Sequence, residues 1–225
     1  MTLAVRASVE DTDDDRLELL RNVEAITGTA ANQLSDEKKQ DERNPWIAEG
    51  MWHLCLFLSS RNQAFHSTGT VIALDRPHIG AKDHGFDVVA LYETAQADFG
   101  VSLVECKAYE KDPGKAINVA VEFFRAFDGG KHDARIRQVV SYFRELLHAQ
   151  KQQRISPSLW KTARLYLPNP HYDAASAVDW LTKRPSFKSL KFPVIVMPHA
   201  VPSFRTYFDR VAMAMLAFGG TLKNV

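Results

Sequence analysis

Residues 85–112 of the chain read GFDVVALYETAQADFGVSLVECKAYEKD, and two strand-like runs within them decide the fold. Each run is apolar enough for a strand in the middle of a covered sheet, and a polar loop at 94–100 separates the two. The spacing predicts a hairpin. Both runs also carry charge where a core strand is normally apolar: Asp87 in the first, Glu105 and Lys107 in the second. These charges need an explanation, because burying an ionised group without a partner is costly.

The rest of the sequence predicts helices and strands on either side of this hairpin. Apolar residues recur at helical spacing over residues 11–28, 44–62, 115–127, 132–154 and 202–218. The last of these helices is expected to stop at Gly219 or Gly220. Strands are expected within 66–85 and over 162–170 and 192–199, with a short helix over 176–184. We therefore predict an α/β fold, a mixed central sheet flanked by helices on both faces.

Charge is unevenly distributed, although the formal net charge is only +1. Residues 1–50 hold 12 Asp and Glu against 6 Lys and Arg, whereas residues 131–164 hold 8 Lys and Arg against 2 Asp and Glu. We interpret residues 1–44 as an acidic, helical extension and residues 45–225 as the main domain. The basic stretch supplies candidate contacts to nucleic acid, although such runs are as often solvated helix faces; these candidates are Arg135, Gln138, Arg144 and Lys151.

Several classes of protein are disfavoured by motifs that the sequence lacks. The two cysteines, Cys55 and Cys106, lie in apolar runs without a CxxC neighbour, which favours buried thiols over a disulfide framework or a zinc site. Nothing resembles a signal peptide or a membrane span, so we expect a cytoplasmic protein that does not enter a membrane. No nucleophile elbow, ATP-binding loop or dinucleotide fingerprint is present.

The charged residues of the hairpin are predicted to converge. Residues two apart in a strand share a face, so Glu105 and Lys107 point the same way and Cys106 points the opposite way. Asp87 precedes Glu105 by 18 residues, and a hairpin would bring the two together. A third carboxylate, Glu49, lies on a preceding helix that is apolar nearly all round, which indicates a confined position.

Such a grouping has a specific chemistry. Converging carboxylates either take up a proton or bind a cation. A hard divalent ion such as Mg²⁺ (or Mn²⁺) prefers oxygen ligands, and here Asp87, Glu105, Glu49 and the backbone carbonyl of Cys106 would supply them. Lys107 would orient or deprotonate an attacking water and neutralise charge on a phosphate.

The pattern Asp87, then Glu105-Cys106-Lys107, resembles the D…(D/E)xK core of the PD-(D/E)xK nuclease superfamily. Glu49 matches the additional metal-binding acid that the superfamily often carries on its first core helix. One departure is that Phe86, not proline, precedes Asp87. The resemblance covers about residues 45–147 and implies a restriction-endonuclease-like sheet and a metal-dependent nuclease, with Asp87, Glu105, Lys107 and Glu49 as the catalytic set.

A narrower resemblance follows the second strand. The acid and lysine lead into Tyr109, the charged pair Lys111-Asp112 and the helix start Ala116-Ile117, which is similar to the nuclease subunit of the Hachiman anti-phage defence system. This similarity implies a DNA-cleaving enzyme that works with a helicase partner and is restrained until infection.

Other interpretations remain open at this point. Each charge taken alone fits a structural role: Asp87 could bond a backbone amide, Glu105 and Lys107 could form an ion pair, and Glu49 could be an exposed helix residue. The chain could also be an inactive nuclease-fold subunit that docks a partner such as a helicase. A third possibility is an interaction protein that binds a basic partner through its acidic extension.

Overall fold

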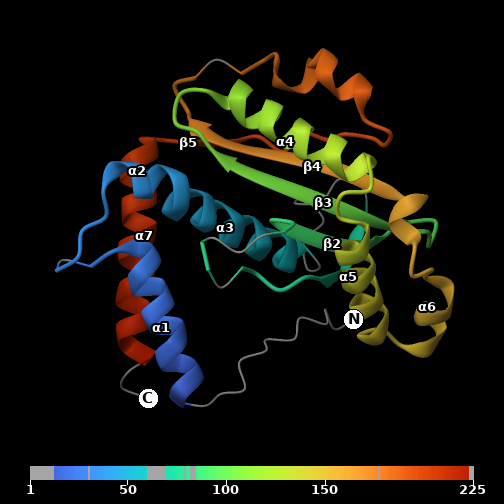
Figure 1. Ribbon diagram of the computed structural model, residues 1–225, viewed down its shortest axis with the longest axis horizontal. Helices are drawn as coiled ribbons and strands as arrows, with labels where there is room; N and C mark the ends of the chain where they lie inside the picture. The colour runs from blue at the N-terminus through green and yellow to red at the C-terminus, as the bar shows by residue number, and fades with distance from the viewer. Residues whose placement is uncertain are drawn as a thin grey trace.

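The computed structural model describes residues 13–29, 31–59, 69–78, 80–81, 85–176 and 178–222. A five-stranded sheet in the order β1-β2-β3-β4-β5 forms the centre of the molecule (Figure 1). The β1–β2 and β2–β3 pairs are antiparallel, and the β3–β4 and β4–β5 pairs are parallel. The strands are β1 (Thr70–Leu74), β2 (Val88–Glu93), β3 (Phe99–Ala108), β4 (Arg164–Asp173) and β5 (His199–Val201).

Helices occupy most of the remaining described chain. The α-helices are α1 (Asp13–Thr27), α2 (Asp36–Lys38), α3 (Asn44–Ser59), α4 (Pro113–Asp128), α5 (Asp133–Glu145), α6 (Ala149–Arg154) and α7 (Phe204–Leu222). A π-helical turn, η1 (Lys39–Arg43), leads into α3, and the short 3₁₀ segments are η3 (Leu159–Lys161), η4 (Leu181–Lys183) and η5 (Pro185–Ser189).

The sheet has a hydrophobic core on each face. One face carries Val89, Leu91 and Leu103 and packs against α4 and α5. The opposite face carries the alternate residues of the same strands, such as Val88 and Val104, and packs against α3 and α7. Because both faces are covered, the strands are apolar on both sides. The predicted mixed α/β sheet with helices on both faces is confirmed.

The predicted hairpin is also confirmed. Strands β2 and β3 pair from Val88↔Val104 to Glu93↔Phe99, and the turn between them places Ala97 at a φ of 64°. The predicted helix start after β3 is equally clear, because Asp112 accepts a hydrogen bond from the Lys115 amide and Pro113 occupies the first turn of α4.

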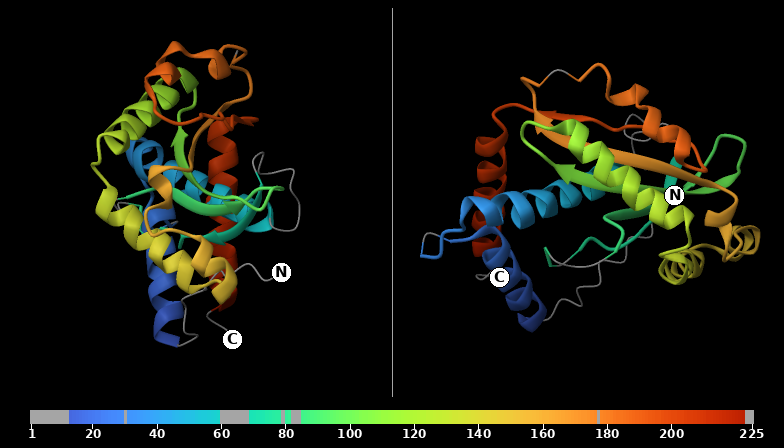
Figure 2. Two further views of the ribbon diagram at one scale, coloured as in Figure 1. Left: turned by 90° about the vertical axis from the view of Figure 1, so that its right-hand side faces the viewer. Right: turned by 45° about the horizontal axis from the view of Figure 1, so that its top comes forward.

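The described part of the acidic extension packs against the end of the chain. Helix α1 runs beside α7 (Figures 1 and 2), where Leu20 lies against Gly219 so closely that a Cβ there would be 2.6 Å from its Cδ2. Buried Arg43 forms an ion pair with Asp209 at 2.7 Å. Residues 1–12 of the proposed extension lie outside the described residues.

Three predicted helical segments need correction. The helix expected over 132–154 divides into α5 and α6, because no large apolar residue follows Leu147 until Ile155 to hold a straight continuation against the core. The helix expected over 176–184 is only the 3₁₀ turn η4. Helix α7 does not stop at Gly219 but continues to Leu222, since that glycine makes room for Leu20 and does not terminate the helix.

The strand expected over 192–199 is also wrong. This segment runs beside β4 through separate hydrogen bonds, Ile195 N to Tyr166 O at 2.9 Å and Met197 N to Pro168 O at 3.0 Å, and forms only one isolated bridge before β5. The prolines of β4, Pro168 and Pro170, fall on the side turned toward this segment. They lack an N–H, so a regular ladder cannot form there.

No helix in the described ranges is both long enough and apolar enough to cross a membrane.

Candidate active site

The candidate site lies where β3 extends beyond the start of β2, and we call this place, beside residues 105–107 of β3, the notch. The last β2–β3 pair is Val88↔Val104, but β3 continues to Ala108, paired with β4 alone among the described strands. Cys106 is fully buried, and within the described ranges its amide therefore has no strand partner on the β2 side. Asp87, the residue directly before β2, fills this role because its Oδ2 accepts a hydrogen bond from Cys106 N at 2.7 Å. An unpaired buried amide would be costly, so this bond fixes the carboxylate in the notch.

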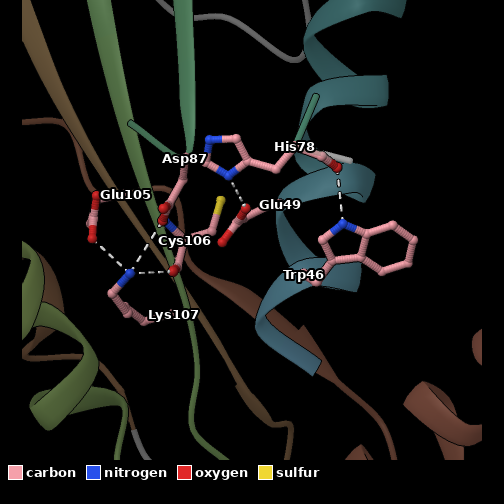
Figure 3. Close-up of polar contacts among 7 residues, drawn as sticks. All are labelled: Trp46, Glu49, His78, Asp87, Glu105, Cys106 and Lys107. Carbon is pink, nitrogen blue, oxygen red and sulfur yellow. Dashed lines mark hydrogen bonds and ion pairs between the residues drawn. The ribbon is translucent and has the colours of Figure 1, made fainter. Parts of the chain in front are cut away.

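The ammonium of Lys107 lies at the centre of the notch (Figure 3). Its Nζ is 2.6 Å from Glu105 Oε1 and 3.2 Å from Asp87 Oδ2. It also donates a hydrogen bond to the backbone carbonyl of Cys106 at 2.9 Å. A positive charge is thus held by two carboxylates and a carbonyl, which are three of the four groups that the sequence predicts as metal ligands.

Glu105 is the most deeply buried of the three carboxylates. Only 5% of the residue is exposed, and its second oxygen, Oε2, is buried without a hydrogen-bond partner in the described part of the chain. Burial raises the pKa of Glu105 to about 8, and the negative charge of Asp87 adds to the increase, although Lys107 opposes it. A buried carboxylate oxygen without a partner costs free energy unless a ligand or ion completes it.

Lys107 remains protonated in this arrangement. Burial alone would lower its pKa, but the neighbouring carboxylates of Glu105 and Asp87 outweigh burial and raise the pKa above the usual lysine value. A lysine in this state cannot accept a proton, so it contributes a positive charge and hydrogen-bond donors. In this position Lys107 can orient a water molecule or neutralise charge on a phosphate, which are two of the parts that the sequence predicts for it.

Glu49 reaches the notch from α3, on the other face of the sheet. Its Oε2 is 3.0 Å from Nδ1 of His78, and the side chain is largely buried, so Glu49 is not an exposed helix residue. Burial raises the pKa of Glu49, the hydrogen bond from His78 lowers it, and the charge of Asp87 raises it. Its charge helps to raise the pKa of Glu105, but its contact is His78 and not Lys107 (Figure 3).

His78 is a component of the site that sequence reasoning missed. It lies in the irregular segment after β1, and its carbonyl accepts a hydrogen bond from Trp46 Nε1 at 2.9 Å. Trp46 and Glu49 lie one turn apart on α3, so the helix holds His78 at two points. Nothing in the spacing of His78 could have indicated this role. His53, one turn after Glu49, is a buried histidine whose Nε2 is 2.6 Å from the carbonyl of Asp75.

The donor set fits a hard cation only with a change in Lys107. Among the described residues, no three histidine, cysteine or acidic side chains are placed to hold a metal ion by themselves. Asp87, Glu105 and the Cys106 carbonyl do surround one point, and that point holds the Lys107 ammonium. Oxygen donors around a positive charge are what Mg²⁺ requires, so these residues fit the ion if the lysine moves aside.

The predicted nucleic-acid contacts are scattered along α5 and α6. Arg135 and Gln138 are exposed, and the Arg135 guanidinium lies against Gly85, two residues before Asp87. Arg144 and Lys151 make internal contacts: Arg144 Nε donates to the carbonyl of Gln152 at 3.4 Å, and Lys151 forms an ion pair with Glu93. Arg135 therefore contacts the segment that carries Asp87.

Comparisons with known proteins add no assignment. No family model, curated protein or solved structure matches this chain. The geometry of the notch is therefore what indicates a function.

Proposed function

We propose that the chain is a metal-dependent phosphodiesterase that cleaves nucleic acid, with DNA as the expected substrate and a restriction-endonuclease-like arrangement of its sheet. One observation carries the proposal: Asp87, Glu105 and the Cys106 carbonyl converge on a single cation position, and the buried Glu105 Oε2 has no partner among the described residues. The separate structural roles considered above account for the Asp87–amide bond and for the Glu105–Lys107 pair. They do not account for a buried carboxylate with one oxygen unused.

Each residue would then have a distinct part. Mg²⁺ or Mn²⁺, when bound, would supply a Lewis acid and a water of lowered pKa. Asp87 and Glu105 would hold the ion through their carboxylate oxygens, and Glu105 would have to lose any proton that it carries. Lys107 would turn from the notch toward the phosphate and neutralise charge that develops there. Glu49, oriented by His78, would accept a hydrogen bond from the attacking water.

The test combines metal binding with cleavage. Titration calorimetry of the intact chain with Mg²⁺ or Mn²⁺ should show one or more sites that Asp87→Asn and Glu105→Gln weaken. Cleavage of labelled DNA and RNA, single- and double-stranded, should require the metal and fall at least about 100-fold in each variant and in Lys107→Met. Glu93→Gln is the matched control. Glu93 is the last residue of β2, at the opposite end of that strand from Asp87, and it forms an ion pair with Lys151. Equal cleavage by the wild type and all three site variants would sink the assignment.

A second candidate is favoured by the position of Lys107. If the ammonium occupies the notch permanently, the chain would be an inactive nuclease-fold subunit that docks a partner such as a helicase. The calorimetry separates the two functions, because an inactive subunit would bind neither Mg²⁺ nor Mn²⁺ at these residues. A role in an anti-phage defence system rests on the Hachiman resemblance, and co-purification of a helicase from the native host would support it.

A further inference from the structure

A half-exposed tryptophan lies near the end of β3 at which the notch is found. Trp180 is 45% exposed, although large aromatic side chains are usually covered. Its ring edge lies over Gly114 in the first turn of α4, where an added Cβ would be only 2.7 Å from Trp180 Cη2. Glycine at 114 therefore makes room for the indole ring. The position of the ring is specified by the chain and is not that of a loose surface side chain.

Two further contacts hold Trp180 in place. The Arg184 guanidinium lies over the indole ring, with Cζ 5.0 Å from the ring centroid, and its Nη2 donates to Asn118 Oδ1 at 2.6 Å. The next residue in the chain, Leu181, is buried against Ile117 of α4. A ring held from several sides loses little conformational entropy when a ligand stacks on it.

A second aromatic and cationic pair lies beside the first. Lys115 Nζ is 5.0 Å from the centroid of the Tyr109 ring. Tyr109 follows Lys107 by two residues, and Lys115 is next to Gly114 in α4. The surrounding segment 178–191 adds positive charge, because it contains one acid, Asp179, and the bases Lys183, Arg184, Lys188 and Lys191. We call the group Tyr109, Lys115, Trp180, Lys183 and Arg184 the aromatic–basic patch.

We propose that the aromatic–basic patch binds single-stranded nucleic acid, with an unpaired base stacked on Trp180 and the adjoining phosphates on the basic side chains. This inference rests on the proposed function and names the form of its substrate. Exposed aromatic rings among cations bind single strands by stacking and charge, whereas the bases of an intact duplex are already stacked on one another. Electrostatic attraction to phosphate supplies the rest of the affinity.

The patch differs from the surface that the sequence indicated. Arg135, Gln138 and Arg144 lie on α5 and Lys151 lies on α6, and both helices follow the end of α4 that is opposite Gly114. A helix of the 16 residues of α4 is about 24 Å long, so Gly114 and the last residue of α4 are about that far apart. Tyr109 of the patch follows Lys107 by only two residues, so a single-stranded nucleic acid bound at the patch would have its next phosphates close to the notch.

Binding is measured on the intact chain in EDTA, so that cleavage cannot interfere. The probes are a fluorescein-labelled 12-nucleotide oligothymidylate, the same strand annealed to its complement, and a labelled polyglutamate peptide of equal charge. Fluorescence anisotropy should show the single strand bound more tightly than the duplex or the peptide. Trp180→Ala should weaken single-strand binding about 5- to 150-fold, the effect of losing one base stack. Trp180→Phe should restore part of the affinity, and Arg184→Ala should reduce both the affinity and its salt dependence.

The matched control is Phe218→Ala, which removes an aromatic side chain that is 66% exposed on α7, away from the patch. It should leave binding unchanged. Single-strand affinity that survives Trp180→Ala, or polyglutamate that binds as well as the oligonucleotide, would overturn the proposal. Binding that depends on Trp180 in a chain that cleaves nothing with Mg²⁺ would support the patch and reject the nuclease, so the two failures are distinguishable.

Discussion

Replacing Lys107 by methionine should open the notch to a metal ion and make the stability of the folded chain depend on that ion. The substitution keeps most of the stem of the side chain but removes the charge, which leaves Asp87 and Glu105 facing each other with the Cys106 carbonyl. Removing one partner of a buried ion pair costs about 3–5 kcal/mol. Lys107 is 20% exposed, so we expect about 3 kcal/mol, near the lower end of that range.

Magnesium should return most of this loss. At a free concentration about 100 times its dissociation constant, an ion that binds only the folded state adds about 2.7 kcal/mol. The wild type should gain less, because the ion must first displace the Lys107 ammonium. For a chain of this size a loss of 3 kcal/mol lowers Tm by about 6–12 °C. Thermal unfolding followed by circular dichroism, in EDTA and in MgCl₂, measures both quantities.

A lysine at the other end of β2 provides the control. Lys151 pairs with Glu93, but 32% of its side chain is exposed, so Lys151→Met should cost no more than about 1 kcal/mol and should not respond to Mg²⁺. The reasoning would be refuted if Lys107→Met were no more damaging than Lys151→Met, or if Mg²⁺ stabilised the two variants equally. Either result would mean that the oxygens of the notch do not form a cation site.

Three further predictions concern pH and the extension. Burial, together with the nearby His199, lowers the pKa of His171 to about 3 in the folded chain, whereas the unfolded chain binds this proton near pH 6.5. The free energy of unfolding, measured in urea, should therefore fall by about 1.4 kcal/mol between pH 7.5 and pH 5.5. The variant His171→Leu should lose this part of the acid sensitivity. Because the folded-state pKa of Glu105 is raised to about 8, stability in EDTA should fall as pH rises from 4.5 toward 8, and an unchanged profile in Glu105→Gln would contradict this. Arg43→Ala removes the ion pair with Asp209, and limited proteolysis should then cut within residues 13–43 sooner than in the wild type.

The hairpin and the shared face of its charges could be predicted because both follow from local pattern. Strand alternation places Glu105 and Lys107 together whatever surrounds them, and an 18-residue spacing to Asp87 suits a hairpin. Glu49 could be suspected because its helix is apolar on nearly every side. These inferences need only the geometry of one element at a time.

The remaining features depend on contacts between distant segments. His78 lies in an irregular segment, and only the packing of that segment on α3 brings it to Glu49. The position of Lys107 depends on where β2 begins relative to β3, which sequence spacing leaves uncertain by a few residues. The strand expected over 192–199 was wrong because the effect of Pro168 and Pro170 depends on which side of β4 each proline faces.

The bond between Asp87 and the Cys106 amide has a consequence for chains that diverge from this one. Under the proposed function, a descendant without activity would still retain Asp87, since its carboxylate completes the edge of β3. Glu105 completes no backbone group in this way: one of its oxygens pairs with Lys107, and the other is buried and unused by the described residues. Drift toward glutamine, leucine or valine should therefore begin at position 105. Under the proposed function, the residue at position 105 in divergent copies would distinguish active enzymes from inactive ones, and an aspartate at position 87 would not.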